Sequence, residues 1–173
     1  MVGKVLCIVG QREVGKTTLI ERLVPELKRR GYRVATVKRP REGFEFDTPG
    51  KDGNRHFHAG ADATIVYHEN TVAYIRRAVG RPSLQKLMAD LLPDIDLVLV
   101  EGHKSAPLPK LEVFRSGTHA RPLYSGQPDY LAIASDTPLD LGIPWLSLDD
   151  TAAIADFIAA HFPLALHGRG LSL

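Results

Sequence analysis

The strongest constraint on this chain is a short segment near its N-terminus. Residues 10–17 read Gly-Gln-Arg-Glu-Val-Gly-Lys-Thr, the phosphate-binding Walker A pattern G-x-x-x-x-G-K-[ST]. Residues 5–9 form an apolar run rich in β-branched side chains, and residues from Thr17 onward show helical spacing. Strand, loop and helix follow in the order that a P-loop requires, and a glycine-rich turn without a ligand is the alternative. The pattern favours an α/β fold with a nucleotide site after a buried parallel strand.

The residue types in this segment predict how it binds phosphate. Gly10 and Gly15 allow positive φ angles and a close approach of backbone N–H groups to an anion. We expect the Lys16 ammonium to contact the β- and γ-phosphates as the main catalytic cation, and the Thr17 hydroxyl to ligate Mg²⁺. The remaining predicted phosphate contacts come from the other loop positions and a second hydroxyl: Gln11, Arg12, Glu13, Val14 and Thr18.

Length and composition limit what surrounds this site. The 173 residues, 44% apolar and 24% charged, fit one globular domain, which we place at residues 1–162 with a C-terminal tail at 163–173. The single cysteine, Cys7, excludes an internal disulfide and is expected to be a small buried side chain. No apolar run reaches the roughly 18 residues of a membrane span, and the N-terminus lacks a signal-peptide pattern. We expect a cytoplasmic protein without a membrane partner.

Positive charge is concentrated in residues 28–41, although the net charge is only +2. Residues 28–30 end the first predicted helix, where cations complement the helix dipole. Lys38, Arg39 and Arg41 follow a predicted strand and could meet phosphates. The chain offers no interleaved aromatic motif, so we expect no nucleic-acid partner.

Hydrophobic periodicity predicts alternating strands and helices. The polar segment 39–60 shows no clear periodicity and has the composition of a functional loop. Predicted strands cover about 5–9, 33–38, 97–100, 111–114, 131–134 and 145–146, a hairpin pairs 63–67 with 71–76, and helices cover 17–30, 84–91 and a segment capped by Asp149. We therefore predict an α/β P-loop NTPase fold, with a mixed but mainly parallel doubly wound sheet and helices on both faces.

The position of each acidic residue relative to the strand ends indicates which one can serve the nucleotide site. Asp94 and Asp96 precede the strand at 97–100 and sit at the wrong end, whereas Glu101 leaves its C-terminal edge beside the P-loop. An acid there can hold a water of the Mg²⁺ shell or orient an attacking water, which makes Glu101 the catalytic and metal-binding candidate. A plain surface acid is the alternative. Lys104 follows closely and could bring a cation near the γ-phosphate.

For base recognition and for the long polar segment, the sequence leaves two interpretations of each candidate residue open. The chain has no N-K-x-D motif, but Asp136 follows a strand, where its carboxylate could accept the N1–H and N2–H₂ donors of guanine; a turn cap is the alternative. Asp47, Lys51 and Asp52 offer a second set facing an anion or a metal, and each also suits a turn. From the residues alone, we expect Mg²⁺-dependent binding of a nucleoside triphosphate, with slow hydrolysis allowed.

Several segments together resemble one family. Residues 99–104, Leu-Val-Glu-Gly-His-Lys, with 109–113, Pro-Lys-Leu-Glu-Val, are similar to the signature VEGfK…pKi.v.r. Residues 47–61 contain Asp-Thr-Pro-Gly-Lys-Asp and Ala-Gly-Ala, similar to D.PGKDs…..AGA, and residues 132–136 resemble an AvaSD strand end. These are signatures of the molybdopterin-guanine dinucleotide biosynthesis protein B (MobB) family. Residues 38–41 read Lys-Arg-Pro-Arg where the family often has Lys-His-x-His-H, so no role of those histidines is carried over.

The resemblance implies a GTP-binding P-loop protein, often dimeric, that assists a molybdenum cofactor guanylyltransferase in attaching GMP to molybdopterin. A homodimer would also cover the apolar hairpin at 63–76, because an isolated two-stranded ribbon is marginally stable. Two other functions remain open. A small-molecule kinase would need a mobile lid, for which Arg76, Arg77 and Arg81 are candidates. A metal-delivery GTPase would need soft or imidazole ligands, for which the chain offers only Cys7, His56 and His58.

Overall fold

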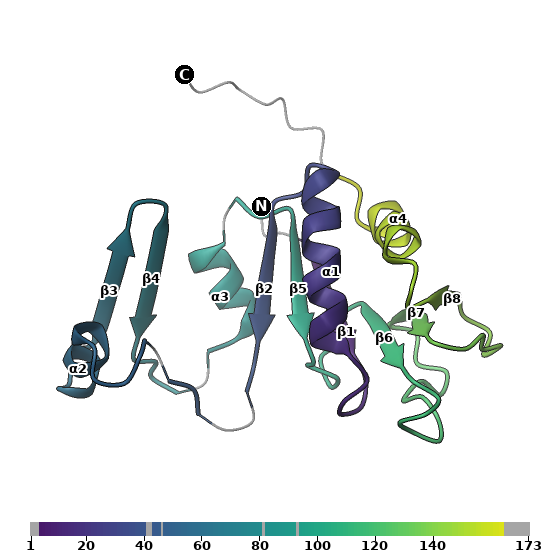
Figure 1. Cartoon of the computed structure of the whole chain (residues 1–173), viewed down its shortest axis with the longest axis horizontal. Helices are drawn as coiled ribbons and strands as arrows, with labels where there is room; N and C mark the ends of the chain where they lie inside the picture. The colour runs from purple at the N-terminus through teal and green to yellow at the C-terminus, as the bar shows by residue number, and fades with distance from the viewer. Residues whose placement is uncertain (1–3, 41–42, 46, 81, 93, 165–173) are drawn as a thin grey trace. The chain divides into compact units, whose positions relative to one another are not determined.

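The computed structural model describes residues 4–40, 43–45, 47–80, 82–92 and 94–164 (Figure 1). The chain divides into two compact units, one formed by the residues up to 39 and from 88 onward, the other by residues 40–87. The first unit contains the P-loop and a six-stranded sheet, and the second contains a helix and a hairpin. Arg41 and Arg81, and residues 165–173 of the tail predicted at 163–173, lie outside the described residues.

The sheet of the first unit has the strand order β2-β5-β1-β6-β7-β8. Its strands are β1 (Lys4–Val9), β2 (Val34–Lys38), β5 (Leu97–Glu101), β6 (Lys110–Phe114), β7 (Tyr130–Ser135) and β8 (Trp145–Ser147). Each neighbouring pair is parallel, so the carboxyl ends of the strands share one edge. The mainly parallel α/β sheet predicted from the sequence is confirmed. The strand β1 lies inside the sheet, between β5 and β6, and delivers the P-loop to this edge.

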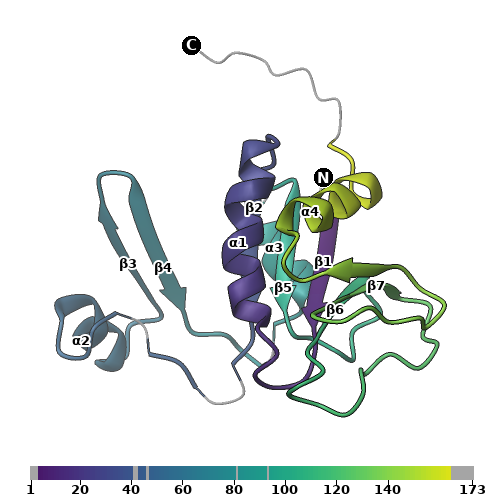
Figure 2. The ribbon, with the colours of Figure 1, turned by 45° about the vertical axis from the view of Figure 1, so that its right-hand side comes forward.

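Helices α1 (Lys16–Arg29) and α4 (Thr151–His161) pack on each other over the apolar core of the first unit (Figure 2). Leu19, Leu23 and Leu27 of α1 are buried at helical spacing against alternate residues of the sheet, such as Leu6 of β1. Each leucine buried this fully stabilises the fold by about 1.5–3 kcal/mol relative to an exposed one. The packing of α1 therefore fixes the helix whose N-terminus receives the P-loop.

The cap of α4 differs from the prediction by one residue. The Asp150 carboxylate accepts a hydrogen bond from the Ala153 N–H at 2.8 Å and caps the helix. Asp149, predicted as the cap, instead contributes its backbone carbonyl, which accepts from the Arg22 guanidinium at 3.0 Å. Either of the two adjacent aspartates could cap the helix by residue type. Asp150 is the cap because the helix begins at the residue after it.

The opposite face of the sheet carries buried charge as well as apolar side chains. Lys110 is 1% exposed, and its ammonium donates to the carbonyls of Ala106 and Leu108, at 2.6 and 3.1 Å, and to the Asp129 carboxylate. Cys7 is buried as expected, and burial raises the pKa of its thiol to about 11. The thiol is therefore protonated and unreactive at neutral pH.

The second unit holds α2 (Asp52–His58), β3 (Ala63–His68) and β4 (Thr71–Arg76), and its C-terminal boundary after residue 87 falls within α3 (Leu84–Leu91). The antiparallel pairing of β3 with β4 confirms the predicted hairpin. The helix α2 lies in a segment for which no helix was predicted, since Phe57 is the single apolar side chain among its seven residues and sets no periodicity. No helix of the described residues is long and apolar enough to cross a membrane.

Candidate functional site

The P-loop connects β1 to α1 and approaches β6 closely. Gly10 has a φ of 148°, and a Cβ atom at this position would lie 2.4 Å from the Val113 carbonyl oxygen, so only glycine fits. Gly15 precedes α1 with a φ of 92°, and no side chain of the described residues caps the helix. The first N–H groups of α1 are thus available to an anion at the carboxyl edge of the sheet.

A cavity of about 400 Å³ opens at this point and collects most of the predicted phosphate contacts. Its lining consists of Arg12, Glu13, Gly15, Lys16, Thr17, Thr18 and Glu101. The Lys16 ammonium donates to the Gln11 carbonyl across the loop. Val14 is 1% exposed and packs into the core, which leaves its backbone alone to act in binding.

Glu101 is placed at the end of β5 beside the P-loop. Its Oε1 atom accepts hydrogen bonds from the Thr17 hydroxyl and from the Lys38 ammonium, each at 3.1 Å. The Glu101 side chain is 16% exposed, so these donors satisfy a carboxylate that is mostly removed from water. Sequence reasoning identified Glu101 and Thr17 and named Lys38 as a cation that could meet phosphates, but it did not predict the contact of Lys38 with Glu101, because the adjacency of β2 to β5 is a tertiary feature.

A hydroxyl and a carboxylate that meet at the phosphate cavity fit Mg²⁺. This ion prefers oxygen ligands and is usually held by one or two protein oxygens, substrate phosphates and water. The described residues contain no group of three or more His, Cys, Asp or Glu side chains suited to a metal. The donor set of Thr17 and Glu101 therefore suits Mg²⁺ arriving with a nucleotide better than a tightly held transition metal.

The segment after β6 packs on the P-loop through residues that sequence reasoning missed. Arg115 donates from Nε to the Val14 carbonyl at 3.1 Å, and its guanidinium would touch a Cβ atom at Gly15. His119 Nε2 lies 2.8 Å from the Arg12 carbonyl oxygen. The Gln11 side chain donates to the Arg121 carbonyl at 2.9 Å. The position of Arg115, directly after a strand at the carboxyl edge, was the one sequence signal for this contact.

Buried Glu112 anchors the far part of that segment. Its two carboxylate oxygens accept the backbone N–H groups of Leu123 and Tyr124 at 2.6 and 2.9 Å. Burial raises the pKa of Glu112, and these two hydrogen bonds and the charge of Lys104 oppose the rise. Lys104, predicted near the γ-phosphate, lies in the turn after β5 behind Gly102 and His103, both of which have positive φ.

Asp136 follows β7, which is two strands away from β1 in the sheet. Its Oδ1 atom accepts the Ser116 N–H at 3.0 Å, and this bond lowers the pKa of Asp136. The carboxylate thus caps the turn that begins with Arg115, as its alternative interpretation proposed. Asp136 is not among the residues that line the P-loop cavity.

Asp47, Lys51 and Asp52 lie in the second unit, around the start of α2. Asp47 accepts the Thr48 N–H at 2.7 Å, Lys51 precedes the helix, and Asp52 pairs with Arg55 at 3.7 Å between exposed side chains. These contacts are those of a turn and a helix start.

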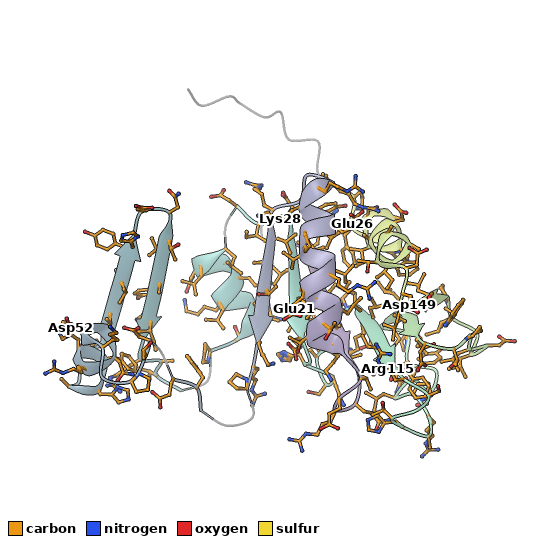
Figure 3. The ribbon with its side chains drawn as sticks, in the orientation of Figure 1. Glu21, Glu26, Lys28, Asp52, Arg115 and Asp149 are labelled. Atoms are coloured by element: carbon orange, nitrogen blue, oxygen red, sulfur yellow. The ribbon has the colours of Figure 1, made fainter. Side chains whose placement is uncertain are left out.

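Arg77, one of the arginines considered for a lid, is held within the second unit. The Arg77 guanidinium donates to the carbonyls of Phe57 and Ala61, at 2.6 and 3.2 Å, and stacks 4.5 Å from the centre of the Phe57 ring. A guanidinium with three partners is fixed in place, and it ties α2 to the end of β4. Figure 3 shows the side chains of both units, with Arg115 at the end of β6.

Comparison with known proteins gives concordant results. The family model for "Molybdopterin guanine dinucleotide synthesis protein B" matches residues 5–136. Molybdopterin-guanine dinucleotide biosynthesis adapter proteins of Escherichia coli K12 and Haemophilus influenzae are 34% and 35% identical to the chain, over 83% and 88% of its length and 85% and 86% of theirs. The crystal structure of Bacillus subtilis MobB is similar with a TM-score of 0.72 at 26% identity, covering 95% of this chain and 99% of that one.

Proposed function

This chain belongs to the molybdopterin guanine dinucleotide synthesis protein B (MobB) family, and we propose that it is a GTP-binding adapter in molybdenum cofactor biosynthesis. In this role it assists a guanylyltransferase that converts molybdopterin to molybdopterin guanine dinucleotide. The observation that supports nucleotide binding is the hydrogen bond between Thr17 and Glu101, which both line the P-loop cavity. This contact joins the two oxygen ligands that a Mg²⁺–nucleotide needs from the protein.

Different residues of the cavity bind the phosphate oxygens and the Mg²⁺ ion in this proposal. Backbone N–H groups from Gly10 to Thr17 and the N-terminus of α1 hold phosphate oxygens, and Lys16 adds a mobile positive charge. Thr17 and Glu101 hold Mg²⁺, which neutralises phosphate charge when it is bound. Glu101 is also placed to orient a water for slow hydrolysis.

Guanine selectivity is assigned to Asp136. Its Oδ1 atom is engaged with Ser116, and the carboxylate retains further acceptor capacity for the N1–H or N2–H₂ of guanine. Adenine presents no such pair of donors in that arrangement. The position at the carboxyl end of β7 supports the assignment, because ligands of open parallel sheets bind along that edge.

A homodimer forms, in this proposal, through one face of the hairpin. Ile65 pairs with Tyr74 and Tyr67 pairs with Val72, so these four side chains share one face, and each is at least 45% exposed. We call this set the hairpin face. Apolar side chains gathered on a two-stranded ribbon are typical of an interaction surface. The second copy covers this face, and the guanylyltransferase and its anionic pterin meet the P-loop edge of the first unit.

Calorimetric titration tests the nucleotide part. Wild-type protein with Mg²⁺ is expected to bind GTP more tightly than ATP, and Lys16→Ala should lose at least about tenfold in affinity, since a charge-assisted contact contributes about 1.5–3 kcal/mol. Thr17→Ala should weaken binding with Mg²⁺ more than binding in EDTA. Equal affinity for GTP and ATP would contradict guanine selectivity, and unchanged affinity in Lys16→Ala would contradict the site.

The adapter role requires a second measurement. Conversion of molybdopterin to its guanine dinucleotide by a purified guanylyltransferase is followed with and without this protein. A faster conversion that Lys16→Ala fails to support is expected. No change in conversion at saturating adapter would contradict the role, whatever the nucleotide affinity.

A further inference from the structure

Two donors from different elements meet on one oxygen of Glu101. The Thr17 hydroxyl, at the start of α1, and the Lys38 ammonium, at the end of β2, each lie 3.1 Å from Glu101 Oε1. The register of the sheet fixes this meeting, because Lys38 is paired with Glu101 across β2 and β5. The Lys38 ammonium is therefore separated from the proposed Mg²⁺ ligand Thr17 by a single carboxylate oxygen.

We propose that Lys38 is a γ-phosphate-binding residue that distinguishes a nucleoside triphosphate from a diphosphate. This inference rests on the proposed binding of Mg²⁺–GTP at the P-loop. When Thr17 and Glu101 hold Mg²⁺, Lys38 exchanges the Glu101 oxygen for an oxygen of the terminal phosphate. Lys38 thus approaches the phosphates from the β2 side, whereas Lys16 reaches them from within the loop.

The cavities around Thr17 and Glu101 support an approach of Lys38 to the phosphates from the β2 side. A second cavity of about 460 Å³ adjoins the phosphate cavity, and Thr17 and Glu101 line both. Lys38 lines the second cavity together with the acidic Glu21 of α1, Thr36 of β2 and apolar side chains of both elements such as Ile20 and Val37. A phosphate that extends past Thr17 toward this cavity meets Lys38 as the cation at its edge.

The ion pair that Lys38 would give up is open to water on the lysine side. The Lys38 side chain is 61% exposed and the Glu101 side chain is 16% exposed, so the ammonium is readily hydrated when it leaves, whereas the carboxylate needs another positive partner in its place. The long flexible stem of Lys38 lets the ammonium move between partners without a change in the backbone. Mg²⁺ and its water shell would take the place of the Lys38 ammonium beside the Glu101 carboxylate.

The test is a pair of titrations with GTP and GDP, each with Mg²⁺. Lys38→Met is compared with Lys28→Met, which removes the same charge from an exposed position in the last turn of α1. Lys38→Met should lose about tenfold in GTP affinity and stay within about twofold for GDP, because only the triphosphate presents the contacted group. Lys38→Arg should recover most of the GTP affinity. Lys28→Met should change neither affinity.

The unchanged GDP affinity also shows that the variant is folded. Equal losses for GTP and GDP, or no loss for GTP, would overturn the assignment of Lys38 while leaving the nucleotide site intact. A wild-type protein that binds neither nucleotide would overturn the proposed function itself, and the inference with it.

Discussion

The Arg115 guanidinium donates from Nε to the Val14 carbonyl oxygen, 3.1 Å away, although 101 residues separate the two in the chain. Val14 is buried, so its carbonyl has little access to water and depends on this donor. The same guanidinium lies against Gly15, where a side chain would touch it. Arg115 therefore supports the P-loop from the outside, as a positioning residue.

Replacing Arg115 should weaken the binding of every phosphate ligand of the P-loop by a similar factor. Arg115→Gln should lower the free energy of unfolding by about 1–3 kcal/mol, since it leaves a buried carbonyl without its donor. Affinities for GTP and GDP should fall by a similar factor, unlike the selective loss expected for Lys38. Chemical denaturation and calorimetry measure the two effects. Arg121→Gln is the control, because Arg121 contacts the P-loop through its backbone. Wild-type stability in Arg115→Gln would contradict the supporting role.

Glu101 should affect hydrolysis more than binding. Glu101→Gln keeps an oxygen for the Thr17 hydroxyl but loses the charge that the metal shell and an attacking water require. We expect GTP affinity within a few fold of the wild type and a much larger loss in the rate of phosphate release. Glu69→Gln, in the turn between β3 and β4, is a matched control. Parallel losses of binding and rate would identify Glu101 as a structural residue.

Asp136→Asn separates base recognition from the turn cap. The amide retains an oxygen for the Ser116 N–H but adds donors that oppose those of guanine. GTP affinity should fall, and tolerance for xanthosine triphosphate should rise relative to it. Asp140→Asn removes the same charge from an exposed position and should change neither. Loss of thermal stability without a change in the GTP to xanthosine triphosphate ratio would leave Asp136 as a turn cap alone.

Acid should weaken the fold partly through Glu26. Hydrogen bonds from Arg29 and then Arg30 lower the pKa of Glu26 from 4.5 to about 2. A carboxylate whose pKa is depressed in the folded state contributes stability above pH 4.5, and this contribution disappears as the pH falls toward 2. Glu26→Gln should therefore flatten the decline in melting temperature between these pH values, whereas Glu21→Gln on the same helix should not. Identical pH profiles for wild type and Glu26→Gln would contradict the linkage.

The elements that sequence predicted well are those with a local physical signal. The P-loop, the buried strands and the amphipathic helix α1 each carry their pattern within a few consecutive residues. The helix α2 has no apolar stripe, and the contact of its Phe57 ring with Arg77 is a tertiary one. The pairing of Lys38 with Glu101 and the support of Val14 by Arg115 depend on strand order, which local patterns do not encode.

The two faces of the hairpin show the same limit. Both alternating rows of β3 and β4 contain apolar residues, so periodicity alone does not decide which row is covered within the unit. In the structure, Thr64 is buried opposite half-buried Ile75, and a Cβ atom at Gly53 of α2 would strike Val66 of the same row. The row left exposed is the hairpin face, which contains Ile65 and Tyr74.

A charge on the hairpin face should therefore disrupt the proposed homodimer. Light scattering at micromolar concentration should give about twice the 19.0 kDa chain mass for the wild type. Ile65→Lys should shift it toward one chain, because a lysine buried between two copies would lose its hydration. Asn70→Lys, at the exposed turn of the same hairpin, adds an equal charge outside this face and should remain dimeric. A wild type that is monomeric would refute the dimer, whereas a dimer that survives Ile65→Lys would place its interface elsewhere on the chain.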